Sequence, residues 1–172
     1  MTTSAMEFVA LDVGLLILRV GVGVVFALHG FQKLFGWFGG GGIDGTAGWF
    51  RSLGFGGGRV AAVLAGSSEI AGGLGLALGL LTPAAAAAVI GTMTVAAFVN
   101  GTENGFWSVS KGWELNGYLI VVAWALATTG PGSLSLDALL GLPLEGVLVG
   151  LAALLAGVGL GTLRWVTRSR DT

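Results

Sequence analysis

The stretch LRVGVGVVFALHGFQKLFG, residues 18–36, resembles a membrane-spanning helix but carries three basic groups. A spanning helix needs about 20 mostly apolar residues, and this run supplies them apart from Arg19, His29 and Lys33. At about 100° per residue, the three basic side chains fall within an arc of roughly 80°. Because a charge facing lipid is costly, we expect this arc to point into a bundle of helices.

The composition of the whole chain indicates an integral membrane protein. Of its 172 residues only 10% are charged and 54% are hydrophobic, whereas soluble domains average about 25% charged. The net charge of −1 gives no basic surface for nucleic acid, and the lack of cysteine excludes disulfides, thiolate metal sites and thiol catalysis on this chain. No Lys or Arg precedes Arg19, so we interpret the first apolar stretch as a retained helix, not a signal peptide.

Five apolar segments predict an all-α integral membrane protein that forms one helical domain. They cover about residues 13–35, 60–81, 83–99, 115–130 and 144–163. Thr82 and Pro83 suit the start of the third segment, as a cap and a first-turn residue. The run SLSLDALLG, 133–141, is expected to lie on the surface as a short amphipathic helix. The glycine-rich stretches at 36–45 and 54–59 are expected to be loops, and they lack the pattern of a phosphate-binding loop.

The Lys and Arg residues near the ends of these segments predict an orientation in the membrane. With the N-terminus outside, the inner side receives seven basic residues and the outer side none. These are Lys33, Arg51, Arg59, Lys111, Arg164, Arg168 and Arg170. Without the fifth span, the same charges would be divided between the two sides. We therefore expect a multi-pass protein of the cell membrane, with its N-terminus outside and its C-terminus in the cytoplasm.

Glu69 is the only acidic residue in the middle of a predicted span, and three glycines lie within four residues of it. Those glycines remove side-chain bulk, so another helix can approach closely. By helical rise, Glu69 differs in depth from His29 by about 5 Å and from Arg19 by about 10 Å. The sequence therefore predicts Glu69 within hydrogen-bonding reach of His29 or Arg19, directly or through water, with Arg19 above this cluster and Lys33 below it.

The segment 98–118 adds polar and aromatic side chains at the inner end of the bundle. Two interpretations remain open: a polar pocket that opens to the inner side, or a buried polar knot that fixes helix register beside a solvated loop with interfacial tryptophans. The candidate pocket and proton-relay residues are Arg19, His29, Lys33, Glu69, Asn100, Trp107, Lys111 and Glu114. No metal site is expected, because no His or carboxylate group has ligand spacing.

Four stretches of the chain resemble the DoxX family of small integral membrane proteins. They are LRVGVGVVFALHGFQKLFG (18–36), GSSEIAGGLGLALGLLTP (66–83), MTVAAFVNGTENGFW (93–107) and GWELNGYLIVVAWALATTGPGSLSLDALL (112–140). The shared pattern is an Arg, then His-Gly and Lys-Leu, a mid-helix Glu before Gly-Gly, and an aromatic loop leading to Glu. Asn100 stands where family members often have His. The resemblance, over about residues 15–140, implies a four-helix core at about 13–140, and the helix at about 144–165 is additional to it.

The resemblance also implies a link to redox chemistry, because relatives are associated with a terminal oxidase, with thiosulfate:quinone oxidoreduction and with oxidative-stress systems. Two functions remain open. In the first, the chain is an oxidoreductase-associated accessory, not a stand-alone enzyme, and its polar groups bind a quinone-like lipophile. In the second, it is a non-catalytic scaffold whose pairs Gly75/Gly79 and Gly146/Gly150 pack against a partner subunit or a second copy. Five spans without an inverted repeat disfavour a small permease.

Overall fold

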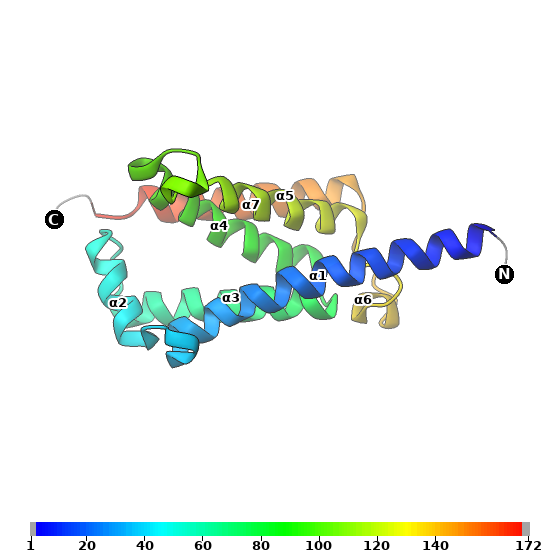
Figure 1. The fold of residues 1–172 in the computed structure, drawn as a ribbon, viewed down its shortest axis with the longest axis horizontal. Coiled ribbons are helices and arrows are strands. Elements are labelled where there is room, and N and C mark those ends of the chain that lie inside the picture. The colour runs from blue at the N-terminus through cyan, green and yellow to red at the C-terminus, as the bar shows by residue number, and fades with distance from the viewer. Residues whose placement is uncertain (1–2, 170–172) are drawn as a thin grey trace.

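The computed structural model describes residues 3–169, with side chains from Val9 onwards, and this part of the chain is helical without a strand. Five long helices run between the two ends of an elongated bundle. They are α1 (Thr3–Phe35), α3 (Gly58–Leu78), α4 (Thr82–Asn104), α5 (Glu114–Thr129) and α7 (Val147–Val166). The shorter elements are η1 (Trp37–Gly39), α2 (Gly42–Ser52), η2 (Ser108–Ser110) and α6 (Leu136–Leu139). The two termini lie at opposite ends of the bundle (Figure 1).

Four of the long helices are long and apolar enough to cross a membrane: α1 from Val9 onwards, α3, α4 and α7. The helix α5 has 16 residues, which is about 24 Å at 1.5 Å per residue, whereas the hydrocarbon core of a bilayer is about 30 Å thick. Its neighbours α4 and α7 cover part of its surface. The predicted all-α membrane fold is confirmed, and each of the five predicted segments is a helix.

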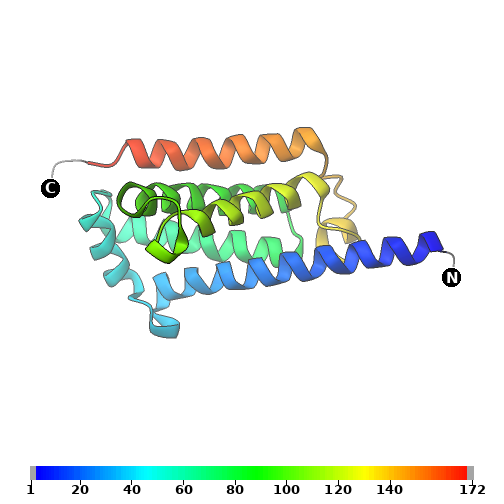
Figure 2. The same cartoon turned by 45° about the horizontal axis from the view of Figure 1, so that its top comes forward.

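The long helices form two layers that α3 and α4 join. One layer holds α1 against α3, and the other holds α4, α5 and α7, which all pack against one another (Figures 1 and 2). Glycines bring α1 and α3 together backbone to backbone: a Cβ on Gly73 would lie 2.5 Å from the carbonyl oxygen of Gly23, and a Cβ on Gly30 would lie 2.6 Å from that of Gly66. Such contacts need glycine, and they set the register of the two antiparallel helices.

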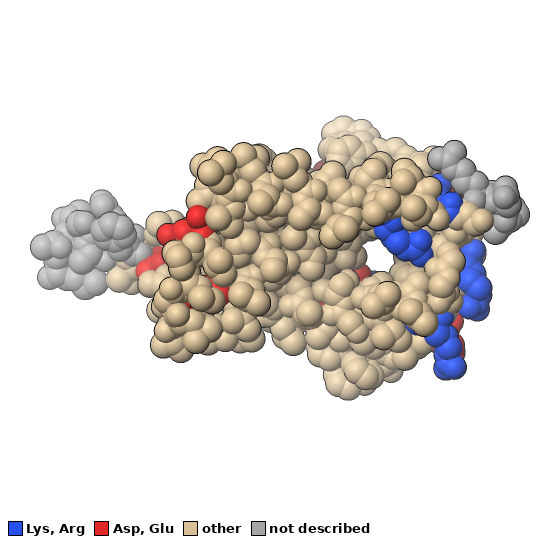
Figure 3. All heavy atoms as spheres, turned by 180° about the vertical axis from the view of Figure 1, so that it is seen from behind, with Lys and Arg blue, Asp and Glu red and all other residues tan. Residues whose placement is uncertain are grey.

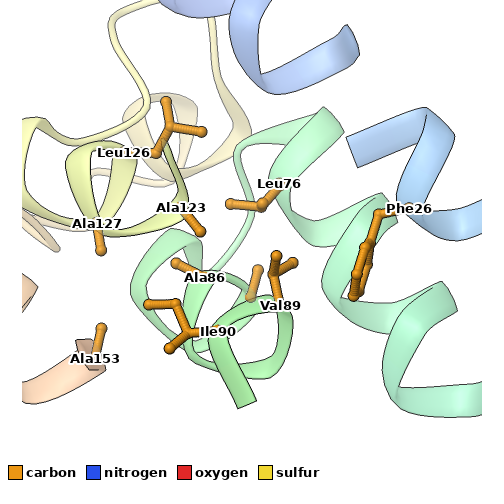
Figure 4. Close-up of a cluster of buried hydrophobic side chains, with 10 residues drawn as sticks. Phe26, Leu76, Ala86, Val89, Ile90, Ala123, Leu126, Ala127 and Ala153 are labelled. Carbon is orange, nitrogen blue, oxygen red and sulfur yellow. The ribbon is translucent and has the colours of Figure 1, made fainter. Parts of the chain in front are cut away.

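One apolar cluster draws on all five long helices (Figure 4). Its buried members are Phe26, Leu76, Ala85, Ala86, Val89, Ile90, Ala123, Leu126, Ala127 and Ala153. Leu76 and Val89 lie between Phe26 of α1 and the alanines of α5 (Figure 4). Because Leu76 is near the end of α3 and Ala85 is near the start of α4, this core occupies the half of the bundle nearer to α6.

The expectation that the stretches 36–45 and 54–59 are loops is wrong in part, because one helix begins at Gly42 and another at Gly58. The helix α2 occupies Gly42–Ser52 and stands across the ends of α1 and α3 (Figure 1). Thr46 and Ala47 are buried on its inner face, and the Thr46 hydroxyl donates to the Lys33 carbonyl at 3.3 Å. The run of glycines before Ile43 suggested a break, but from Ile43 onwards the apolar residues have helical spacing.

The expectation that the segment 133–141 lies on the surface as a short amphipathic helix is correct only in part, since most of the segment is exposed. Only Leu136–Leu139 is helical, and Asp137 within it is buried. The Asp137 carboxylate accepts hydrogen bonds from the backbone N–H groups of Leu81 and Thr82, at 2.7 and 2.9 Å, and from the Thr82 hydroxyl at 2.7 Å. Asp137 therefore caps α4 from 55 residues away, in place of Thr82, whereas Pro83 lies in the first turn as predicted.

Candidate functional site

The inward faces of four helices change from apolar to polar toward the end of the bundle opposite α6. Side chains seven residues apart on a helix lie on nearly the same face. Such pairs are Phe26 and Lys33 on α1, Leu76 and Glu69 on α3, Met93 and Asn100 on α4, and Ala123 and Asn116 on α5. In each pair the apolar residue belongs to the core or packs against it. We call Lys33, Glu69, Asn100 and Asn116 the polar half of the interior, and the exposed His29 lies at its edge.

Lys33 and Glu69 form an ion pair between α1 and α3. The Lys33 Nζ lies 2.7 Å from the Glu69 Oε2, and the two side chains are 22% and 3% exposed. A buried carboxylate needs such a partner, because an unpaired charge in an apolar interior is costly. The prediction that Glu69 bonds directly to His29 or Arg19 is wrong, since its hydrogen bond comes from Lys33.

The register of α1 and α3 explains this pairing. Gly30 contacts Gly66 and Ile70, so His29 is nearly level with Glu69. However, the His29 side chain lies at an exposed edge of α1, where its Nδ1 is 3.0 Å from the Gln32 Oε1. The Lys33 side chain extends back along the helix and reaches the carboxylate from one turn away.

Arg19 lies far from this pair, near α6. Along α1 it is ten residues from His29, which is about 15 Å at 1.5 Å per residue. Its side chain is buried, and it donates to the carbonyl of Ala77 at 2.5 Å and to the carbonyl of Leu134. Because Ala77 is in the last turn of α3, the guanidinium stabilises the C-terminus of that helix and fastens the α5–α7 connection to it. The structure therefore separates Arg19 from the other candidate residues.

Asn100 and Asn116 connect α4 to α5 within the polar half. The Asn100 side-chain amide donates to the Asn116 Oδ1 at 3.0 Å, and the Asn116 amide lies 3.5 Å from the Met93 sulfur. Asn116 is buried, whereas Asn100 is half-buried. Asn116 was not among the candidate site residues, although its position seven residues before the apolar Ala123 could have indicated an inward face.

The three remaining candidates lie in or beside the loop between α4 and α5. The Glu114 carboxylate accepts a hydrogen bond from the Ser108 N–H at 2.9 Å and so stabilises the loop. The Trp107 side chain is 64% exposed, and Lys111 is exposed with a left-handed backbone conformation, φ +63°. Among the described residues, these three have no hydrogen bond to the Lys33–Glu69 pair.

Figure 3 shows an opening between the two layers, near the end of the bundle where Lys and Arg side chains gather. We call this the basic end; its described basic residues are Arg51, Arg59, Lys111, Arg164 and Arg168. A cavity of about 240 Å³ lies here between the last turns of α2, α4 and α7, with Leu53, Val99 and Trp165 in its lining. On the inward face of α4, burial falls from Val89, which is fully buried, to Ala96, which is partly exposed.

The last turn of α7 and the turn between α2 and α3 are joined at this end. The Ser169 N–H donates to the Gly54 carbonyl at 2.9 Å, and the Arg164 guanidinium donates to the Gly56 carbonyl at 3.0 Å. The Phe55 ring lies 6.2 Å from the Trp165 ring. We call these contacts the α2–α7 link. Through this link α7, which was expected to be additional to the four-helix core, covers part of the basic end.

Three of the four glycines expected to face a partner contact their own chain. A Cβ on Gly75 would lie 2.8 Å from the Ala85 Cβ, Gly79 faces the α5–α7 connection, and Gly150 faces Thr128. Only Gly146 has open space around it. Among the residues that the structure describes, no three His, Asp or Glu side chains form a group that could hold a metal ion.

More than half of the chain matches the model of a known family. The model of the DoxX family matches residues 14–101, which extend from α1 to the last turn of α4. The matched part contains Arg19, His29, Lys33, Glu69 and Asn100, and it ends before α5 and α7. No curated protein and no solved structure matches the chain.

Proposed function

Because the chain belongs to the DoxX family, we propose that it is an accessory subunit of a membrane redox or oxidative-stress system, and that the polar half of its interior binds a quinone-like lipophile. The observation that carries this proposal is the Lys33–Glu69 ion pair, which lies where the apolar core ends. A ligand with a flat apolar ring and polar edge atoms needs both kinds of surface side by side.

The groups of the polar half suit the carbonyl oxygens of a quinone. The Lys33 ammonium and the side-chain amides of Asn100 and Asn116 are hydrogen-bond donors, and His29 can donate or accept according to its protonation. Glu69 holds the ammonium in place at 2.7 Å. The side chain of Phe26, on the same face of α1 as Lys33, supplies an apolar surface for a ring. The chain has no cysteine, so electron transfer in this proposal takes place on the bound molecule.

The charges at the two ends support the proposed orientation in the membrane. The basic end carries Arg51, Arg59, Lys111, Arg164 and Arg168, whereas Asp12, Asp137 and Glu145 lie near α6. Figure 3 shows this separation. Arg170, the seventh basic residue of the predicted inner side, lies outside the described residues. Since basic loops remain in the cytoplasm, we place the basic end there and the N-terminus outside the cell.

The second candidate function is a scaffold without chemistry. Gly14 and Gly21, seven residues apart on α1, have no atom within 4 Å of the position of an added Cβ. Small residues on an open helix face allow another helix to approach closely. In this case the Lys33–Glu69 pair would serve only to fix the register of α1 and α3. A permease is disfavoured, because the apolar core lies between the polar half and the buried Arg19 and Asp137.

A double substitution separates the two functions. Replacing a buried ion pair by apolar groups is often tolerated by the fold, so Lys33→Met with Glu69→Leu should insert and accumulate normally. If the pair belongs to a binding site, cells that depend on this variant should lose tolerance to an oxidant such as hydrogen peroxide. The matched control is Asp44→Asn with Arg59→Gln, which removes an ion pair whose side chains are 76% and 70% exposed. Full tolerance in cells with the first variant would reject the site and favour the scaffold.

A further inference from the structure

We infer that the polar half of the interior is reached sideways from the lipid, and that its water-facing end is closed by α2 and the α2–α7 link. The sequence alone had suggested a pocket open to the inner side, that is, at the basic end. The inference rests on the proposed function for the identity of the ligand, but the route of access follows from the arrangement of the helices.

The helix α2 stands where an opening to water would lie. It crosses the end of the space between the two layers (Figure 1). Its Thr46 and Ala47 are buried, and Thr46 is fastened to the Lys33 carbonyl, directly below the Lys33–Glu69 pair. A solute that comes from the basic end therefore meets the inner face of α2 before it meets Lys33.

The α2–α7 link holds α2 in this position. Two hydrogen bonds join the α2–α3 turn to the last turns of α7, from Ser169 to Gly54 and from Arg164 to Gly56. The Phe55 ring packs between the rings of Phe50 and Trp165, at 5.9 and 6.2 Å. Gly54 has φ +79°, and a Cβ on it would collide with the Ser169 carbonyl. A side chain at this position would therefore break the link.

The bundle is open at one of its sides. The helix α1 packs along α3 but makes little contact with α5, and Figure 3 shows the opening on a side of the molecule, between the two layers. Partly exposed Ala96 is on the inward face of α4, in line with buried Val89. In a membrane such a side opening faces lipid tails, so it suits a ligand that is dissolved in the bilayer and carries an apolar tail.

Single cysteines can test this route, because the chain has none of its own. The probe position is Ala96→Cys, which leaves the polar side chains intact, in protein reconstituted into lipid vesicles. Pyrenyl maleimide, which dissolves in the bilayer, should label it. The charged reagent MTSET should label it at least about tenfold more slowly than it labels Lys111→Cys, because a fixed charge enters the membrane interior at a high cost. Val89→Cys, at a fully buried position, should react with neither reagent.

Opening the link gives the complementary test. Adding Gly54→Val to Ala96→Cys should raise the rate of MTSET labelling, whereas adding Gly56→Ala should not, because a Cβ on Gly56 meets nothing within 4 Å. MTSET labelling of Ala96→Cys as fast as that of Lys111→Cys, or no labelling by the maleimide, would overturn the inference. None of these measurements uses a quinone. They can therefore reject the sideways route without rejecting the proposed function, and the proposed function can be rejected without rejecting the route.

Discussion

Lys33 and Glu69 join α1 to α3 by an ion pair whose two halves are covered differently: the carboxylate side chain is 3% exposed and the lysine side chain 22%. The protein thus encloses the negative charge and leaves part of the positive one accessible. If the ion pair were only structural, both side chains could be buried equally well. This asymmetry is what a donor held ready for a polar ligand atom requires.

Breaking this pair should cost stability. Lys33→Met leaves Glu69 buried without its partner, and we expect the free energy of unfolding to fall by about 3 kcal/mol, the lower end of the range for a broken buried pair. Lys33→Met combined with Glu69→Leu should restore most of that loss. Unfolding in mixed detergent micelles measures both variants. If the single and double variants have the same free energy of unfolding, the buried Glu69 carboxylate does not need Lys33 as its partner.

The exposed pair of Asp44 and Arg59 is the control for that experiment. Its side chains are 76% and 70% exposed, and surface pairs contribute about 1 kcal/mol or less. Asp44→Asn should therefore change the unfolding free energy by less than a third of the Lys33→Met effect. An equal loss of unfolding free energy at the two pairs would show that the burial of Glu69 does not cause the loss in Lys33→Met.

The effect of a Gly→Ala substitution on stability should depend on whether the glycine lies in the contact between α1 and α3. Gly23→Ala and Gly73→Ala place a Cβ against the backbone of the neighbouring helix, and such overpacking typically costs about 1–3 kcal/mol. Gly21→Ala places its Cβ in open space and should be neutral or gain up to about 1 kcal/mol from helix propensity. Thermal unfolding in detergent gives the comparison. Similar losses for Gly21→Ala and Gly23→Ala would contradict the described register.

The cap that Asp137 provides for α4 should contribute more to stability than its hydrogen bond from the Thr82 hydroxyl. Asp137→Ala leaves the backbone N–H groups of Leu81 and Thr82 without their acceptor, and we expect a loss of about 2 kcal/mol or more. Thr82→Val removes only one hydrogen bond and should cost about 1 kcal/mol. Hydrogen exchange at the Leu81 and Thr82 amides should accelerate in Asp137→Ala. Unchanged exchange there would argue against the cap.

The orientation in the membrane can be measured with two exposed positions. Leu139 near α6 is 79% exposed, and Val109 at the basic end is 95% exposed. In intact cells a membrane-impermeant maleimide should label Leu139→Cys at once and Val109→Cys only after permeabilisation. The reverse pattern would invert the proposed topology, and labelling of both positions from outside would contradict the opposite placement of the two ends.

The long helices could be predicted from the sequence because apolar runs of about 20 residues have few other stable forms in a membrane. The inward direction of Lys33 and Glu69 could also be predicted, from charge cost and glycine spacing. The helix α2 was missed, because the glycines before Ile43 indicate a break and conceal the helical spacing that follows. The burial of Asp137 could not be predicted, because its partners Leu81 and Thr82 are 55 or more residues away in the chain.

The pairing of Glu69 could not be obtained from depth alone. Helical rise placed His29 nearly level with Glu69, which agrees with the contact of Gly30 with Gly66. The partner of Glu69 also depends on the angular position of each side chain around α1 and on its length, and depth gives neither. Lys33 is one turn further along α1 but has a longer side chain on the arc that faces α3, and so it reaches the carboxylate.

The most direct measurement is native mass spectrometry of the protein released from mild detergent micelles. We expect a bound species with the mass of a membrane quinone on the wild-type chain. This species should be lost from the Lys33→Met, Glu69→Leu double variant and kept by the Asp44→Asn, Arg59→Gln control. A wild-type chain without any bound lipophile, or a double variant that retains the quinone as the control does, would contradict a binding site at Lys33 and Glu69.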